Sequence, residues 1–195
     1  MINLMEYKII PEFINDEELN TIKQLFENNN PNLKWFKMKN YSSISLDKNL
    51  GLTNKFLLCR SQTEVIRKNN KAYSQLFEII ENALSKYNLK LLFDRIGTRK
   101  YEIGDFMGWH SDFDLELSET KNTVLEYECV LVLENTSDSM TQFKVEDSST
   151  DKVTIESYVS KEKDVLILCR RGIKHQVTPL TKGSRLTLKF TACNK

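Results

Sequence analysis

The sequence predicts a mainly β protein with amino-terminal helices, an α+β chain whose carboxyl-terminal part forms a β-sandwich or jelly roll. Apolar residues alternate with period two in six short segments after residue 90, and no helical pattern separates these segments. Before residue 90, apolar residues recur mainly at the spacing of amphipathic helices. Many short strands in succession are typical of a sandwich or jelly roll.

The amino-terminal region is expected to open with a strand at residues 4–10, which Pro11 ends. Asn15 or Asp16 can then cap a helix, because a short polar side chain accepts a hydrogen bond from the first helical turn. One stripe of that helix is apolar and would lie on a core. Its residues are Leu19, Ile22, Leu25 and Phe26.

Three further segments precede the β region. A strand is expected at 33–38 and an amphipathic helix at about 70–87. Between them, residues 40–54 are polar and rich in turn formers, so they are expected to form a loop. A loop of this length in a compact domain is either functional or disordered. Residues 40–54 are therefore one candidate lid, and the weakly patterned segment 113–123 is the other.

The β region is expected to hold six strands separated by polar connectors. They are predicted at 95–103, 124–133, 141–145, 153–159, 164–169 and 184–192. No linker divides the chain, so residues 1–94 are interpreted as a supporting region of the same domain as the β core at 95–195.

Composition indicates a globular protein without a strong charge bias. Of the 195 residues, 40% are hydrophobic and 28% are charged, and the formal net charge is +1. This charge predicts no global attraction to nucleic acid, although it leaves a local basic face open. The amino terminus lacks signal-peptide features and no stretch of ~18 apolar residues occurs, so a cytoplasmic protein without membrane spans is expected.

The four cysteines, at positions 59, 129, 169 and 193, contain no C-x-x-C pair. Cys129 and Cys169 fall within apolar runs. Buried free thiols in a reducing compartment are therefore expected.

The two histidines of the chain mark the candidate site. His110 and Asp112 are two residues apart, so on an extended strand both side chains leave the same face. With His175 as a third ligand they would form a 2-His-1-carboxylate triad, a set that leaves coordination positions open and is diagnostic of non-heme Fe(II) oxygenases. Arg185 follows His175 by ten residues, and its guanidinium fork suits a dicarboxylate held in one orientation.

These residues resemble the Fe(II)/2-oxoglutarate-dependent dioxygenase superfamily, and its prolyl 4-hydroxylase-type branch in particular. The pattern of that branch is met by Tyr101, Gly104, His110 and Asp112, then by His175 with Arg185 ten residues later. Its Thr-x-Phe is met by Thr141-Gln-Phe143, although Ser139-Met140 stands where the branch usually has two glycines. The strong resemblance covers about residues 95–192.

The resemblance implies a double-stranded β-helix and a ligand set. His110, Asp112 and His175 would hold Fe(II), while Arg185 and Tyr101 would bind 2-oxoglutarate. With O2 as the second cosubstrate and ascorbate as a candidate reductant, the enzyme would hydroxylate an unactivated C–H bond and release succinate and CO2. Beyond the metal ligands, no catalytic residue is predicted.

The substrate class stays open between alternatives. The branch implies a protein or peptide side chain, proline first, with Trp109 and Asp114 as candidate contacts. Residues 108–114 also resemble AlkB-type nucleic-acid demethylases, but Arg185-Leu-Thr-Leu-Lys-Phe-Thr191 lacks the asparagine and second arginine of their usual ending. Nucleic acid is therefore less favoured, and a basic, aromatic-lined cleft would support it. A small-molecule hydroxylase and a catalytically silent binding module are the remaining alternatives, and the oligomeric state is left open.

Overall fold

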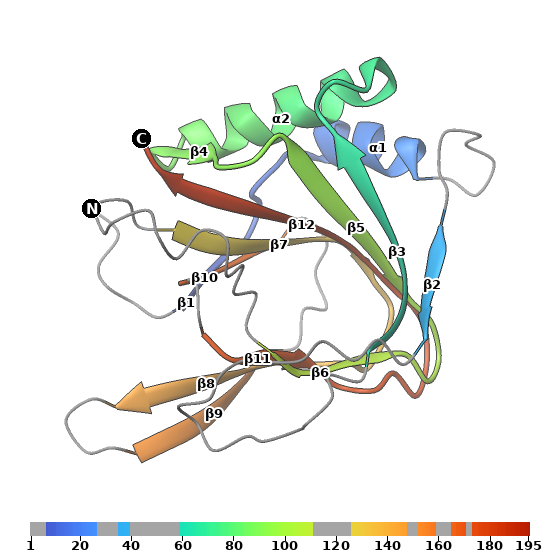
Figure 1. Cartoon of the computed structure of the whole chain (residues 1–195), viewed down its shortest axis with the longest axis vertical. Coiled ribbons are helices and arrows are strands. Elements are labelled where there is room, and N and C mark those ends of the chain that lie inside the picture. The colour runs from blue at the N-terminus through green and yellow to red at the C-terminus, as the bar shows by residue number, and fades with distance from the viewer. Residues whose placement is uncertain are drawn as a thin grey trace.

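The computed structural model describes residues 7–26, 35–39, 59–110, 126–147, 152–158, 165–170 and 173–195. Over these residues the chain forms one sheet of twelve strands, which folds back on itself into two layers (Figure 1). The mainly β, jelly-roll architecture predicted from the alternating apolar pattern is confirmed.

All strand pairs in the sheet are antiparallel, and the order across it is β1-β10-β7-β12-β5-β3-β6-β11-β8-β9, with β2 paired to β3 and β4 to β12. The strands are β1 (Tyr7–Ile10), β2 (Phe36–Lys39), β3 (Cys59–Arg67), β4 (Leu89–Leu91), β5 (Arg95–Tyr101), β6 (Phe106–His110), β7 (Glu126–Asn135), β8 (Thr141–Asp147), β9 (Lys152–Tyr158), β10 (Val165–Arg170), β11 (His175–Val177) and β12 (Arg185–Asn194). The six strands predicted in the β region correspond to β5, β7, β8, β9, β10 and β12.

Two helices cover the outer face of the layer that contains β5, β7 and β12 (Figure 1). Helix α1 (Asp16–Leu25) begins with a capping box: Asn15 Oδ1 accepts from the Glu18 backbone N–H at 2.8 Å, and the Glu18 carboxylate accepts from the Asn15 N–H at 2.9 Å. Of the two expected caps, Asn15 is therefore the one used. Helix α2 (Ser74–Ser85) follows a 3-10 turn at Lys71–Tyr73.

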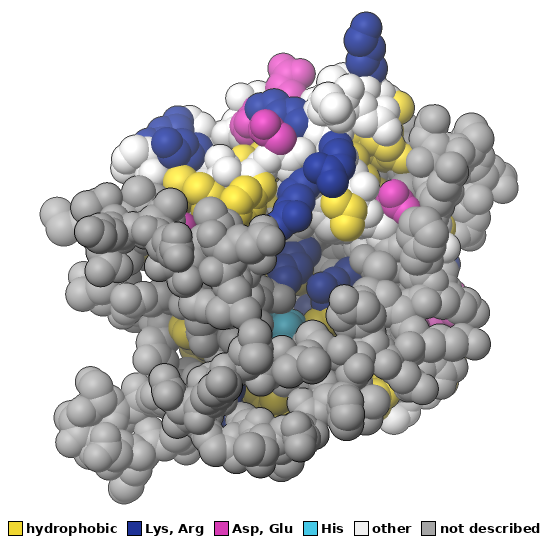
Figure 2. All heavy atoms as spheres, viewed as in Figure 1, with side chains coloured by type: hydrophobic (Ala, Val, Ile, Leu, Met, Phe, Trp, Pro, Cys, Tyr) yellow, Lys and Arg dark blue, Asp and Glu magenta, His cyan; other side chains and the backbone are white. Residues whose placement is uncertain are grey.

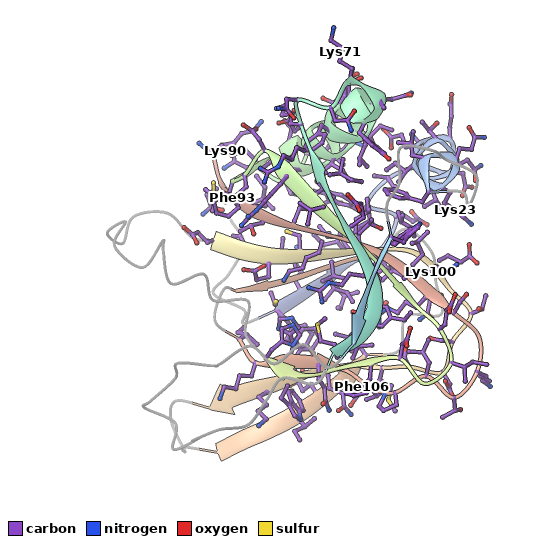
Figure 3. All side chains as sticks on the ribbon, turned by 45° about the vertical axis from the view of Figure 1, so that its right-hand side comes forward. Lys23, Lys71, Lys90, Phe93, Lys100 and Phe106 are labelled. Carbon is purple, nitrogen blue, oxygen red and sulfur yellow. The ribbon has the colours of Figure 1, made fainter. Side chains whose placement is uncertain are left out.

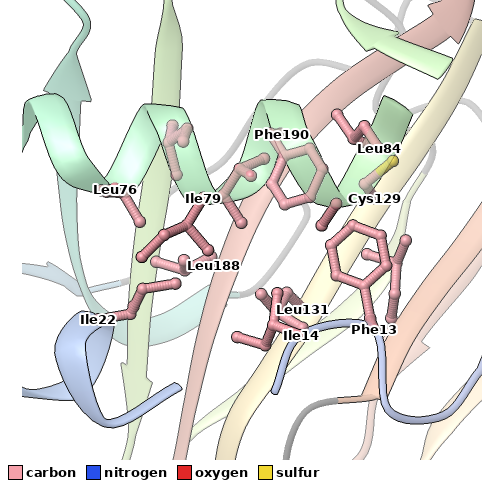
Figure 4. Packing of buried hydrophobic residues seen from close by; sticks show 14 of the residues in the cluster. Phe13, Ile14, Ile22, Leu76, Ile79, Leu84, Cys129, Leu131, Leu188 and Phe190 are labelled. Carbon is pink, nitrogen blue, oxygen red and sulfur yellow. The ribbon is translucent and has the colours of Figure 1, made fainter. Parts of the chain in front are cut away.

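The main core lies between these helices and the sheet (Figure 4). Leu76 and Ile80 of α2 are fully buried in the same cluster as Leu188 and Phe190 of β12. Each such side chain contributes about 1.5–3 kcal/mol when it leaves water. Because neighbouring residues on a strand point to opposite faces, this packing turns Arg185 and the other odd-numbered residues of β12 toward the space between the two layers.

Strand β3 joins the two layers, and the sequence pattern did not predict it. Its residues 62–67 pair with β5, while 59–60 pair with β6. The sheet therefore passes from the helix-covered layer to the layer of β6, β11, β8 and β9 through this one strand. On the opposite side, the layers meet where Tyr7 of β1 stacks on Phe143 of β8, with ring centroids 4.5 Å apart.

Two smaller predictions concern residues that the structure describes. Cys129, Cys169 and Cys193 are buried free thiols, as expected for cysteines in apolar strands. In the described part of the chain, neither helix has the length and apolar character needed to cross a membrane.

Gly183 lies in the turn before β12 and is expected to tolerate no side chain. Its φ is +68°, and a Cβ there would lie 2.3 Å from the Thr136 carbonyl oxygen. We expect Gly183→Ala to lower the free energy of unfolding by about 2 kcal/mol or more, because backbone strain and a backbone clash add. Chemical denaturation measures this change. Gly97→Ala is the matched control, since its Cβ would meet Lys189 at an ordinary 3.7 Å. Equal losses in the two variants would contradict the expectation.

Candidate functional site

The two histidines, distant in sequence, lie side by side across two paired strands. His110 ends β6, His175 begins β11, and the two residues are direct partners in the antiparallel ladder. Their ring centroids are 4.2 Å apart, with the ring planes inclined by 53°. The sheet thus brings together the two imidazoles that the sequence predicted to bind one metal ion.

Each imidazole is oriented by a hydrogen bond to the backbone carbonyl two residues before it. The Nδ1 of His110 lies 2.8 Å from the Gly108 carbonyl oxygen, and that of His175 lies 3.0 Å from the Ile173 carbonyl oxygen. A carbonyl only accepts, so each Nδ1 donates, and in the neutral ring Nε2 then carries the lone pair. This tautomer is the one that binds a metal through Nε2, with the Nδ1 hydrogen bond fixing the ring.

The predicted third ligand, Asp112, lies outside the described residues, as does Asp114. Among the residues that are described, no group of three or more His, Cys, Asp or Glu side chains forms a metal site. Of the three predicted metal ligands, the structure therefore describes the two neighbouring imidazoles. They suit a transition metal held by nitrogen donors, and Asp112 follows His110 by two residues.

Arg185 begins β12 and is buried, with 2% of its surface exposed. It lies opposite Tyr101 of β5 in the ladder, and its Nη2 donates to Thr141 Oγ1 at 2.8 Å. Its Nε is buried and has no hydrogen-bond partner within the described part of the chain. Burial lowers the pKa of the guanidinium, while Tyr101 and Tyr158 act in the opposite direction. A buried cation with an unsatisfied donor needs an anionic ligand.

One pocket connects the histidine pair with Arg185. Its lining includes His110, His175 and Arg185, and it also takes in Arg99 and Lys189 from the same layer as Arg185. Figure 2 shows a histidine at the bottom of a hollow, with Lys and Arg side chains above it. The pocket therefore combines two imidazoles, which can bind a metal, with several cations, and this combination suits an anionic small molecule held close to a metal.

Thr141, Arg99 and Lys189 are among the pocket residues that received no role from the sequence. Thr141 was only a motif match, and its contact with Arg185 joins β8 to β12, which are not neighbours in the sheet. Arg99 and Lys189 could have been found, because alternation places them on the same strand faces as Tyr101 and Arg185 respectively.

Trp109 lies at the end of β6 and is half-buried. The Nζ of Lys144, on β8, lies 4.8 Å from the centroid of its ring, within the range of a cation–π contact. The indole ring of Trp109 therefore makes at least one contact within the chain, with Lys144. Both candidate lids, 40–54 and 113–123, lie outside the described residues, so their predicted role stays a prediction.

Asp138 holds the segment between His175 and Arg185 in place. Its carboxylate accepts from the Thr181 N–H at 2.9 Å, from the Lys182 N–H at 3.3 Å and from the Thr181 hydroxyl. These hydrogen bonds, with that of the Thr181 hydroxyl first, lower the pKa of Asp138 to about 2. The folded state therefore favours the carboxylate, and this contribution is complete above about pH 4 and is lost as the pH falls toward 2.

We expect Asp138→Asn to lower the melting temperature at neutral pH, because an amide offers one acceptor oxygen instead of two. The melting temperature of the variant should also fall less steeply than that of wild type as the pH is lowered, because the variant lacks the titrating carboxylate. Melting curves of both proteins at steps between about pH 7 and pH 2.5 measure this. Parallel curves for wild type and variant across this range would show that Asp138 is not the group responsible.

Comparisons with known proteins place the fold in one class. The sequence matches no protein-family model, and a search of curated proteins gives no significant match. The structure, in contrast, has the fold of the 2-oxoglutarate-Fe(II) oxygenases and prolyl hydroxylases, as the sequence resemblance predicted.

Three solved structures illustrate this likeness. A prolyl-4-hydroxylase from Pseudomonas putida matches with a TM-score of 0.63 and 13% identity, over 98% of this chain and 94% of that one. A prolyl hydroxylase from Trichoplax adhaerens, in complex with a hypoxia inducible factor peptide fragment, matches with a TM-score of 0.62 and 13% identity, over 99% and 84%. The viral collagen prolyl hydroxylase of Paramecium Bursaria Chlorella virus-1, a 2-oxoglutarate complex, matches with a TM-score of 0.56 and 12% identity, over 99% and 98%.

Proposed function

We propose that this chain is an Fe(II)- and 2-oxoglutarate-dependent dioxygenase that hydroxylates an unactivated C–H bond. One observation carries the proposal: His110 and His175 lie side by side in a pocket that also contains the buried Arg185. This arrangement occurs in a fold shared with prolyl hydroxylases. A metal site and an anion site within one pocket are what a metal-chelating 2-oxo acid requires.

His110 and His175 would hold the metal through Nε2, and we propose Asp112 as the third ligand because it follows His110 on the same chain segment. Fe(II), 2-oxoglutarate and O2, when bound, supply the oxidising power, and succinate and CO2 are released. We also propose ascorbate as reductant and a cytoplasmic location.

Arg185 would bind the far carboxylate of 2-oxoglutarate. The unsatisfied Nε supports this role, because a carboxylate can accept from Nε and one Nη of the same guanidinium. Thr141 orients the guanidinium through its Nη2, and the Tyr101 hydroxyl, on the residue opposite Arg185, would donate to the same carboxylate. These residues bind and orient the cosubstrate and exclude water from it.

For the substrate we propose a protein or peptide side chain, with proline as the first candidate. The fold shared with a prolyl hydroxylase that was solved with a peptide supports this choice. Trp109 and Asp114 remain the proposed substrate contacts. Oxidative demethylation of nucleic acid is the second candidate, and the cations Arg99 and Lys189 in the pocket are the observation that favours it.

Succinate release tests the proposal. The purified protein is incubated with Fe(II), 2-oxoglutarate and ascorbate, alone, with proline-containing peptides, and with methylated oligonucleotides, and His110→Ala is the control. We expect succinate that disappears in the variant and increases with the peptide pool. An increase with the oligonucleotides alone would select the second candidate.

A further inference from the structure

The pocket face of β5 and β12 is unusually basic. On β5, Ile96 and Thr98 are buried toward the helices, so Arg95 and Arg99 project from the opposite face, toward the space between the layers. Lys189 of β12 lies opposite Gly97 in the ladder, which places it on that same face, diagonally next to Arg99. Arg99 and Lys189 both line the pocket of the histidine pair.

The basic face continues outward from the pocket. Arg67 at the end of β3 lies directly opposite Arg95, and both side chains are exposed. We call Arg67, Arg95, Arg99 and Lys189 the cationic column. Figure 2 shows Lys and Arg side chains arranged one below another down to the histidine in the hollow. The positive charge thus extends from the buried site to the surface.

Among the described residues, two carboxylates on β7, the strand next to β12, lie near this face. On β5 and β12, both described over their full lengths, no Asp or Glu shares the face of the cationic column. On β7, Glu128 and Glu126 lie opposite Thr191 and Cys193, two and four residues beyond Lys189. On the described strands β5 and β12, the charged side chains that line the pocket beside the histidine pair are therefore cations.

We propose that the substrate is an acidic peptide, whose carboxylates bind the cationic column while the target residue reaches the histidine pair. This inference rests on the proposed function and names its substrate class. Acidic side chains close to the target would bind Arg99 and Lys189, which line the pocket, and acidic side chains farther from it would bind the exposed Arg95 and Arg67.

The charge of the whole chain favours a peptide over nucleic acid. The formal net charge is only +1 and the sequence pI is about 7.6. Domains that bind nucleic acid usually have a high pI and spread basic residues over the surface that follows the phosphate backbone. Here the column is local, so it suits a few carboxylates on a short segment.

Binding of labelled peptides tests the inference directly. One fluorescein-labelled proline peptide carries Asp and Glu around the proline, and a matched peptide carries Asn and Gln instead. We expect wild type to bind the acidic peptide at least about tenfold more tightly in fluorescence anisotropy at ~0.15 M salt, and this preference should weaken as salt is raised. Arg99→Gln/Lys189→Gln should reduce the preference to about threefold or less.

Two further variants keep the result interpretable. Arg67→Gln/Arg95→Gln changes only exposed residues and should reduce the preference in part, even if the inner pair proves necessary for folding. Lys71→Gln removes an exposed lysine at the far end of the molecule from β6, which carries Phe106 (Figure 3), and should leave the preference unchanged.

Equal affinity of wild type for the two peptides overturns the inference, and so does tighter binding of a single-stranded oligonucleotide of equal charge. Anisotropy needs no turnover, so these outcomes count whether or not succinate is formed. Succinate release with the neutral peptide alone would leave the proposed function standing and remove the acidic preference. Absence of iron binding would remove the proposed function without changing the peptide result.

Discussion

His175→Ala is expected to reduce succinate formation by at least about a hundredfold while the protein remains folded. Replacing a group that only orients a metal ligand typically costs 10–100-fold, so loss of a ligand itself should cost no less. The remaining imidazole of His110, 4.2 Å away between ring centroids, cannot supply the second nitrogen donor. Mass spectrometry of succinate and the iron content of the purified variant measure the two effects.

Gln176→Ala is the matched control for this experiment. Gln176 is the next residue of β11, and its side chain donates to Gln142 of β8 at 2.5 Å. Because alternate residues of a strand leave opposite faces, its removal should leave succinate formation unchanged. A folded His175→Ala protein with the iron content and turnover of wild type would remove this histidine from the metal site.

Arg185→Met is expected to weaken the binding of 2-oxoglutarate without lowering the stability of the protein. Truncating one partner of a buried charge pair costs about 2–5 kcal/mol of affinity, so the dissociation constant of 2-oxoglutarate should rise about thirtyfold or more. In the absence of 2-oxoglutarate, the variant should be as stable as wild type or more stable, because Met replaces a buried cation whose Nε has no hydrogen-bond partner among the described residues.

Calorimetric titration of 2-oxoglutarate in the presence of Mn(II), together with melting curves, tests both parts. Arg185→Lys keeps the charge without the fork and should lose less affinity than Arg185→Met. Unchanged binding of 2-oxoglutarate by Arg185→Met would assign the cosubstrate to another cation of the pocket, with Arg99 as the first to examine.

Strand β3 shows which part of the fold local patterns do not reveal. Its sequence Cys-Arg-Ser-Gln-Thr-Glu-Val-Ile-Arg is mostly polar, with no apolar alternation. A strand can have this composition because one of its faces is exposed instead of packed in a core, as Val65 shows with 53% exposure. Strands β4 and β11, three residues each, are too short for any periodicity to be recognised.

The positions of several candidate site residues were predictable because these residues are rare or regularly spaced. The only two histidines of the chain proved to be neighbours, and the alternation in β12 correctly placed Arg185 and Thr187 on one face. Thr141 was not predictable as a partner of Arg185, because their contact depends on how the two layers are stacked. That stacking is set by tertiary packing and leaves no local pattern in the sequence.

Oxygen-isotope labelling tests the central proposal most directly. The protein is supplied with Fe(II), 2-oxoglutarate and the acidic proline peptide under 18O2, and succinate and peptide are weighed by mass spectrometry. We predict that one 18O atom enters succinate and the other enters the hydroxylated peptide, and that His110→Ala forms neither product. Iron-loaded protein that binds 2-oxoglutarate and the peptide but forms succinate without 18O, or forms no succinate, would contradict the assignment as a 2-oxoglutarate-dependent dioxygenase.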